Sequence, residues 1–178
     1  MNTRTLCETP VKIIFKGMID LTRRRQPKKP VSIGDVFAIP LSANQYAYGQ
    51  VVGEGNPKTY VIYDITANQH PSLHEVTSKK IIFFTHTVDV PIEDGDWILL
   101  GNVMIPDNIR FPEYIVDTLK GYYVTSYMGD VLRPANDYER ANLGTRKSVS
   151  PSILEDAVKA QYGYETWYTY LDKLKYSF

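Results

Sequence analysis

The sequence predicts an α+β protein whose antiparallel sheet of about six strands is strongly bent or closed into a small β-barrel, with a helical hairpin at the C-terminal end. Three observations support this class. Short runs of β-branched and aromatic residues alternate with turn residues through the first two thirds of the chain. Helical spacing of apolar residues is confined to the last thirty residues or so. With 178 residues, 43% of them hydrophobic, the chain is long enough to form a sizeable core.

The first strands are expected to form an antiparallel meander. The three segments 35–41 (DVFAIPL), 46–52 (YAYGQVV) and 59–66 (TYVIYDIT) are separated by short gaps rich in turn residues. Gly49 interrupts the second segment, and a glycine inside a strand indicates a bulge or a close approach of another backbone.

The middle of the chain adds a short helix and three further strands. Residues 71–77 predict one helical turn, with Ser72 as the N-cap and Glu75 three residues later. The other strand-like segments have buried or alternating apolar residues, and they span residues 80–90, 96–100 and 122–128. The proline-containing segment 102–112 has no period and predicts a loop, and the polar segment 134–149 is expected to be irregular.

Two helices are expected at the end of the chain. Ser150 and Pro151 are typical of the N-cap and the first helical position, and Gly163 suits the residue after the helix. A second helix over about 165–175 would place four apolar residues on one face, namely Trp167, Tyr170, Leu171 and Leu174. The domain organisation that follows is an N-terminal basic extension over 1–30, a strand-rich core over 31–132, and a linker with the helical hairpin over 133–178.

Charge is unevenly distributed along a chain whose formal net charge is zero. Residues 1–30 hold eight basic and two acidic residues, a net charge of +6, so the remainder carries −6. An acidic body of this kind favours a basic protein partner, whereas the short basic extension reads as a solvated connector, so nucleic acid is not the expected partner.

The expected compartment is the cytoplasm. The single cysteine, Cys7, excludes an intramolecular disulfide, and no apolar run approaches the length of a membrane span. The N-terminal residues also lack the order of a signal peptide.

No catalytic motif, cofactor motif or metal motif is present. The chain has no glycine-rich phosphate loop and no GxSxG turn around a nucleophile. His70 and His74 are four residues apart, but Pro71 interrupts the helical spacing and a zinc site needs three or four ligands. Nothing beside Cys7 resembles a general base. We therefore expect no enzyme activity, no cofactor and no metal, and a function based on binding.

A combination of four short motifs resembles a known family. The run GDVFAIPL at 34–41 is followed by YAYGQVV at 46–52, and "GDW" and "GN" follow at 95–97 and 101–102. This combination, covering about residues 33–112, resembles the bacterial immunity protein 26 family. The motif residues read as structural, with Gly34 and Gly95 in turns and Phe37 and Trp97 in the core.

The resemblance implies a protein that protects its producer by binding a cognate toxin of a polymorphic or contact-dependent toxin system, without catalysis. The acidic body suits a basic toxin such as a nuclease. Aromatic residues often anchor such interfaces, so the predicted partner-binding residues are four strand tyrosines and a neighbouring acid, namely Tyr46, Tyr48, Tyr60, Tyr63 and Asp64.

Two alternatives stay open at this point. "Gly-Asp-Val" before a strand also resembles the start of PemK-type ribonuclease toxins, which would make the chain a small-barrel ribonuclease or nucleic-acid-binding module. The catalytic arginine and hydroxyl residue of that family cannot be aligned here. The other alternative is a housekeeping interaction domain without a toxin partner.

Overall fold

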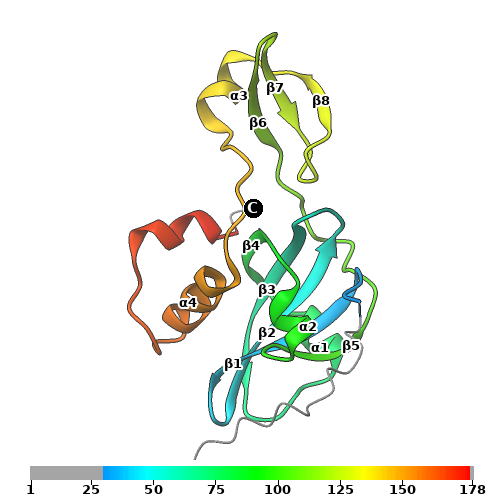
Figure 1. Cartoon of the computed structure of the whole chain (residues 1–178), viewed down its shortest axis with the longest axis vertical. Helices are drawn as coiled ribbons and strands as arrows, with labels where there is room; N and C mark the ends of the chain where they lie inside the picture. Colours follow the sequence, from blue (N-terminus) through cyan, green and yellow to red (C-terminus); the bar gives the residue numbers. More distant parts are fainter. Residues whose placement is uncertain (1–29, 177–178) are drawn as a thin grey trace, which may run out of the picture.

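The computed structural model describes residues 30–176 and contains two antiparallel sheets (Figure 1). Cys7 and residues 1–29 of the predicted basic extension lie outside the described residues. The larger sheet has the order β4-β3-β2-β1-β5. Its strands are β1 (Asp35–Ser42), β2 (Gln45–Gly53), β3 (Lys58–Ala67), β4 (Ile81–Thr87) and β5 (Ile98–Asn102). The α+β class and the meander of the first three strands are therefore confirmed.

The larger sheet is open, so the barrel alternative is not what the chain forms. β4 and β5 are its two edges and do not pair with each other. Single bridges from later segments cover part of the β4 edge, where Ser148 pairs with His86 and Lys175 with Phe83. These bridges satisfy backbone groups that an edge strand would otherwise expose.

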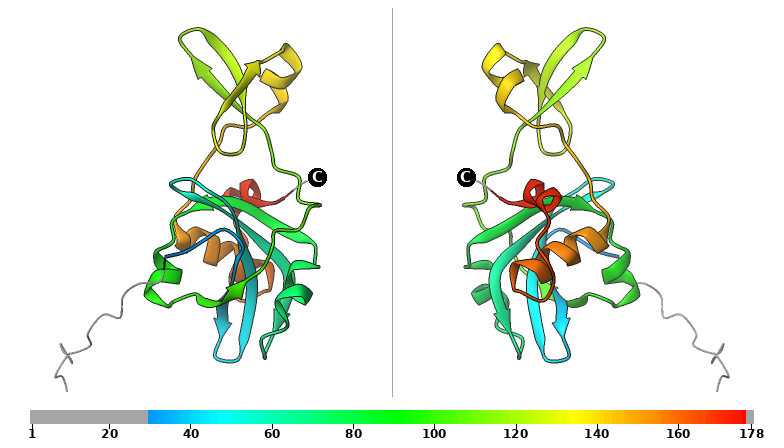
Figure 2. Two further views of the ribbon diagram at one scale, coloured as in Figure 1. Left: turned by 90° about the vertical axis from the view of Figure 1, so that its right-hand side faces the viewer. Right: turned by 90° about the vertical axis from the view of Figure 1, so that its left-hand side faces the viewer.

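One face of the larger sheet is covered by helices. Alternate residues of β1, including Phe37 and Ile39, point to this face, and Phe37 stacks on Trp97 with ring centroids 5.2 Å apart. The cover consists of α2 (Val90–Asp94), α4 (Pro151–Gln161) and the 3₁₀ helix η1 (Thr169–Leu174). Figure 2 shows α4 and η1 lying together on this side of the sheet.

The opposite face is also covered, by α1 (Leu73–Thr77) and the segment 103–111. Val36, Ala38 and Val61 point to this face, where Val76 of α1 and Ile109 pack on them. Helix α1 begins as predicted, because the Ser72 side chain accepts a hydrogen bond from the Glu75 backbone N–H at 3.1 Å. The sheet is thus a middle layer with an apolar core on each side.

Gly49 is required by close packing at the centre of the larger sheet. A Cβ atom there would lie 2.5 Å from Phe37 Cζ and 2.6 Å from the Val61 carbonyl oxygen. The prediction of a close backbone approach is confirmed.

The predicted second C-terminal helix is shorter and tighter than expected. Only Thr169–Leu174 is helical, and it is a 3₁₀ turn rather than an α-helix over 165–175. Leu171 and Leu174 are buried whereas Tyr170 is exposed. Two core residues three apart lie on one side of a 3₁₀ helix, so the tighter turn serves the packing that this segment makes.

The smaller sheet was only partly expected. It has the order β6-β7-β8, with β6 (Tyr114–Thr118), β7 (Gly121–Thr125) and β8 (Val131–Pro134), and helix α3 (Asp137–Asn142) follows it. The sequence predicted only the middle strand and an irregular segment after residue 134. We refer to residues 114–142 as the projecting unit, because Figures 1 and 2 show it standing away from the larger sheet on two connecting segments.

Candidate partner-binding surface

Three of the five predicted contact residues lie in the core. Tyr48, Tyr60 and Tyr63 are at most 1% exposed. The Tyr60 hydroxyl donates to Asp89 Oδ1 at 2.5 Å and that of Tyr63 to a side chain within the sheet at 2.7 Å. Burial raises the pKa of both hydroxyls, and the bond to Asp89 raises that of Tyr60 further. Because both faces of the sheet are covered, these tyrosines cannot contact a partner, and their assignment to a surface patch is corrected here.

The other two predicted residues are accessible but do not lie together. Tyr46 is half-buried and packs against His70, with ring centroids 4.8 Å apart. Asp64 is exposed and accepts a hydrogen bond from the Tyr162 hydroxyl at 3.3 Å. Tyr46 packs with the core on the α1 side, whereas Tyr162 belongs to the core on the α4 side. Tyr46 and Asp64 therefore lie on different sides of the sheet.

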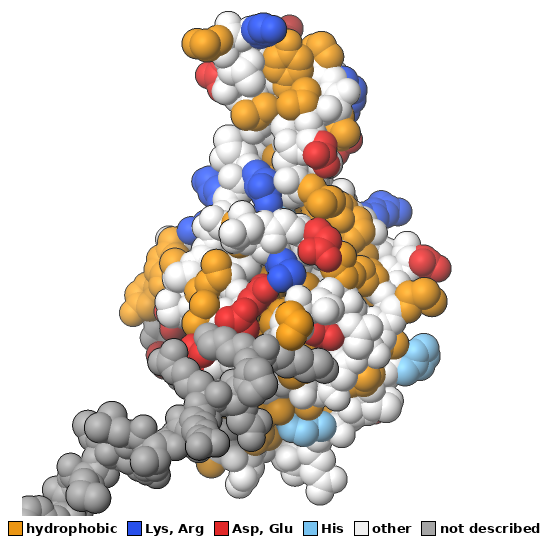
Figure 3. Space-filling view, turned by 45° about the vertical axis from the view of Figure 1, so that its right-hand side comes forward, with side chains coloured by type: hydrophobic (Ala, Val, Ile, Leu, Met, Phe, Trp, Pro, Cys, Tyr) orange, Lys and Arg blue, Asp and Glu red, His pale blue; other side chains and the backbone are white. Residues whose placement is uncertain are grey.

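The projecting unit carries an uncovered apolar sheet face that sequence reasoning missed. Tyr123 and Val131 lie on this face with Leu119, which is fully exposed at the β6–β7 turn. These residues border a shallow hollow of about 440 Å³, whose full lining is Thr118, Leu119, Lys120, Tyr123 and Val131. We call these five residues the bare face. Figure 3 shows hydrophobic side chains gathered on the projecting unit.

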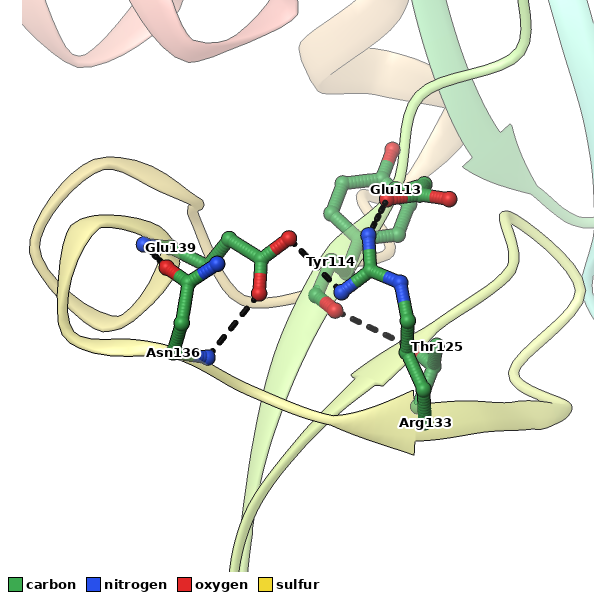
Figure 4. A network of polar contacts seen from close by, with 6 residues as sticks. All are labelled: Glu113, Tyr114, Thr125, Arg133, Asn136 and Glu139. Atoms are coloured by element: carbon green, nitrogen blue, oxygen red, sulfur yellow. Dashed lines mark hydrogen bonds and ion pairs between the residues drawn. The ribbon is translucent and has the colours of Figure 1, made fainter.

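The opposite face of the unit is covered by α3 and held by a charged network (Figure 4). Arg133 of β8 donates to Glu113 at 3.0 Å and contacts Glu139 of α3 at 2.6 Å. Glu139 also closes a capping box with Asn136 at the start of α3. The Arg140 guanidinium lies 4.4 Å from the centre of the Tyr122 ring. The strands and α3 are thus tied together by polar contacts on one side only.

Aromatic packing joins the unit to the larger sheet. Tyr127, in the β7–β8 turn, stacks on Phe111 at 4.2 Å between centroids and contacts Phe84 edge-on at 6.4 Å. A Cβ atom at Gly53 would lie 2.6 Å from the Tyr127 ring, so a glycine at the end of β2 is needed for this contact. The projecting unit that carries the bare face is therefore held to the larger sheet by the packing of Tyr127.

The negative charge of the described chain belongs to the larger sheet and its connections. Residues 31–113 contain ten acidic and four basic residues, a net charge of −6, while residues 114–178 contain eight of each. Four of the acids fall within eight residues around α2, at Asp89, Glu93, Asp94 and Asp96. Asp89 is paired with Lys58. The larger sheet, not the projecting unit, is thus the part of the described chain suited to a basic partner.

Comparison with protein families gives a match to part of the chain. Residues 32–119 match the model of the family described as Immunity protein 26. Over this region the chain belongs to the immunity protein 26 family. No match was found among curated proteins or among solved structures.

Three of the four immunity protein 26 motifs, the first "GD", YAYGQVV and "GN", are joined by one network of hydrogen bonds. Asn102 Nδ2 donates to Asp35 Oδ1 and to the Ile33 carbonyl, each at 2.8 Å, which joins the "GN" motif to the first "GD". Gln50 of the YAYGQVV motif donates to the carbonyl oxygens of Gly34 and Val103. Asp35 and Gln50 are both buried. The structural role predicted for the motifs is confirmed, and none of these buried groups is available to a partner.

The immunity protein 26 match ends at the tip of the β6–β7 hairpin. It covers the larger sheet, α1, α2 and β6. The remaining strands of the projecting unit, α3, α4 and η1 lie beyond it. Three of the five bare-face residues, Lys120, Tyr123 and Val131, therefore lie beyond the region that the family model matches.

The described residues show no arrangement of metal-ligating side chains. Within 30–176, no group of three or more His, Cys, Asp or Glu side chains is placed to hold a metal ion. His70 precedes α1 and lies 3.3 Å from the Tyr48 hydroxyl, while His74 is exposed within α1. No helix among the described residues has the length and apolar character needed to cross a membrane.

Proposed function

We propose that this chain is a non-catalytic immunity protein that binds and neutralises a cognate protein toxin of a bacterial toxin system. The observation that carries this function is the match of residues 32–119 to the immunity protein 26 family. The motif side chains make hydrogen bonds within the fold, so we assign the inhibitory contact to exposed residues outside the motifs.

The bare face of the projecting unit is the proposed centre of that contact. Leu119 is fully exposed and Val131 is 61% exposed, on a sheet face that no other described element covers. A contiguous exposed apolar surface is typical of a protein interaction site. Its position on an extended unit lets it enter a concave surface of the toxin while the rest of the protein remains outside.

The acidic larger sheet supplies the proposed electrostatic part of the recognition. Its net charge of −6 favours a toxin with a basic surface, such as a nuclease. The sequence-predicted residues that remain accessible, Tyr46 and Asp64, are proposed as peripheral contacts on this part of the protein. Because Tyr46 and Asp64 lie on two sides of the sheet, they do not form a single anchor, and we assign the anchor to the bare face.

The experiment tests each toxin-domain protein that is encoded beside the gene for this chain. Co-expression should protect cells from that toxin, and the two purified proteins should form a complex. The double variant Leu119→Asp/Val131→Asp should lose at least about thirtyfold in affinity, because removal of a central interface anchor costs about 2 kcal/mol or more. Met104→Asp is the matched control, since Met104 is an exposed apolar residue outside the unit.

The possible results test the immunity function and the role of the bare face separately. Absence of both protection and complex formation would contradict the immunity function. Unchanged affinity in the folded double variant would refute the bare face as the anchor while leaving the function in place.

A further inference from the structure

A second pocket lies at the junction between the two sheets. It encloses about 270 Å³ and is lined by residues of β4, the start of β6, the segment 144–149 and η1. Its lining residues are Phe84, Thr85, Tyr114, Gly144, Thr145, Lys147, Val149, Lys173 and Leu174. The backbone holds this arrangement, because the Val149 N–H donates to the His86 carbonyl at 3.0 Å and the Thr87 hydroxyl donates to the Val149 carbonyl at 2.9 Å.

The charged residues of this junction pocket all have the same sign. Lys147 and Lys173 line it, and no acidic residue does. Among the residues that the structure describes, neither lysine forms an ion pair. Lys175, two residues beyond Lys173, is by contrast paired with Asp172 at 2.7 Å. The pocket therefore combines two positive charges with no internal counter-charge.

Two further groups at or beside the pocket can favour an anion, Tyr114 by its hydroxyl and Arg146 by its charge. Arg146, between two pocket residues, has a buried Nε without a hydrogen-bond partner among the described residues. The Tyr114 hydroxyl makes no hydrogen bond within the described chain, and Figure 4 shows it pointing away from the polar network of the projecting unit. Burial raises the pKa of Tyr114, and the charge of Arg146 only partly opposes this. Arg146 also contributes to lowering the pKa of the adjacent His86.

We propose that the junction pocket binds an oxyanion, as a phosphate or a carboxylate group, between Lys147 and Lys173 with the Tyr114 hydroxyl as a further donor. Charge-assisted hydrogen bonds from ammonium groups to such oxygens are among the stronger polar contacts in proteins. The volume is more than sufficient for one such group, and the apolar side chains of Phe84, Val149 and Leu174 shield one side of it from water. A bound oxyanion would bridge β4, the segment 144–149 and η1.

Thermal unfolding and ³¹P NMR of the full chain test the site, with inorganic phosphate as the first probe. Phosphate should raise Tm with a saturable dependence on concentration, compared with sodium chloride at equal ionic strength. The ³¹P resonance should broaden on addition of protein. Acetate forms the second arm, and a response to acetate alone would assign the pocket to carboxylate groups, such as a side chain of a bound partner.

The double variant Lys147→Gln/Lys173→Gln should weaken anion binding by about tenfold for each lysine. Both lysines are exposed, so the variant is expected to fold. Lys79→Gln/Lys80→Gln is the matched control, because these lysines are also exposed and form no ion pair within the described residues but lie outside the pocket. Tyr114→Phe removes only the hydroxyl and should weaken binding severalfold.

Three results would overturn the proposal. The first is an equal response to phosphate, acetate and chloride. The second is an unchanged response in the Lys147→Gln/Lys173→Gln variant, and the third is an equal loss in the control variant. None of these measurements uses a toxin, so the outcome is independent of the proposed immunity function.

Discussion

Lowering the pH from about 7 to about 5 is predicted to destabilise the protein through one buried side chain, His86. This residue is 1% exposed. Its Nδ1 lies 3.1 Å from the Thr59 hydroxyl, and its Nε2 has no hydrogen-bond partner within the described residues. Burial, and secondly the charge of Arg146, lower the pKa of His86 from 6.5 to about 4. The rings of Phe84 and Tyr114 complete its surroundings.

The sign of the effect follows from which state binds the proton first. Between pH 6.5 and about pH 4 the unfolded chain protonates His86 while the folded protein keeps it neutral. Stability is therefore lost as the pH falls through this window. At pH 5 the loss is about 2 kcal/mol, since a pKa difference of one corresponds to about 1.4 kcal/mol. For a chain of this length, the loss lowers Tm by about 4–8 °C.

The assay is thermal unfolding as a function of pH for the parent protein and for His86→Asn. Asparagine can retain a hydrogen bond to Thr59 but does not titrate in this range. The Tm difference between parent and variant should therefore change by several degrees between pH 7 and pH 5. His74→Asn, at an exposed position of α1, is the control and should keep the pH dependence of the parent. A difference between parent and His86→Asn that is constant with pH would refute the reasoning.

Three further perturbations test the packing. Gly49→Ala should cost about 2 kcal/mol or more, because the new methyl group meets both a ring and a backbone carbonyl; Gly144→Ala, with no atom within 4 Å, should leave Tm nearly unchanged in the same thermal scan. Tyr48→Ala should destabilise the protein by about 3–5 kcal/mol in urea unfolding, and clearly more than Tyr46→Ala, since only Tyr48 is fully buried; equal losses would contradict this. Arg133→Ala should increase hydrogen exchange in β8 and α3 without changing it in β1–β3, and uniform exchange would contradict its role as a local tie.

The larger sheet was predictable because local signals agree with the tertiary structure. Strands β1, β2 and β3 are short, nearly continuous runs of apolar residues separated by turn residues, and Gly49 marks the close approach at their centre. The open form of the sheet was not predictable. It depends on what covers the faces and the β4 edge, and those segments, such as Ser148 and Lys175, come from the other end of the chain.

The binding residues were harder to predict for the same reason. The sequence around a strand tyrosine does not show whether its face of the sheet is covered or exposed. Here Tyr48, Tyr60 and Tyr63 are buried, because α4, η1 and the segment 103–111 cover the two faces. Strand β8 is four residues long and ends in Pro134, so it has no usable period. The lysines of the junction pocket are 26 positions apart and meet only through tertiary contacts.

The positions of the motif residues bear on how recognition is divided within the chain. Asp35, Gln50 and Trp97 are buried. The Asn102 side chain donates hydrogen bonds to a backbone carbonyl and to Asp35. A change at these positions would alter the fold before it altered a contact with a partner. The motifs therefore specify the scaffold, and under the proposed immunity function the choice of one toxin over another would come from surface residues. The projecting unit meets this requirement, since it combines an uncovered apolar face with a sequence that lies largely beyond the family match. Exchange of that unit should consequently change partner choice without changing the fold of the larger sheet.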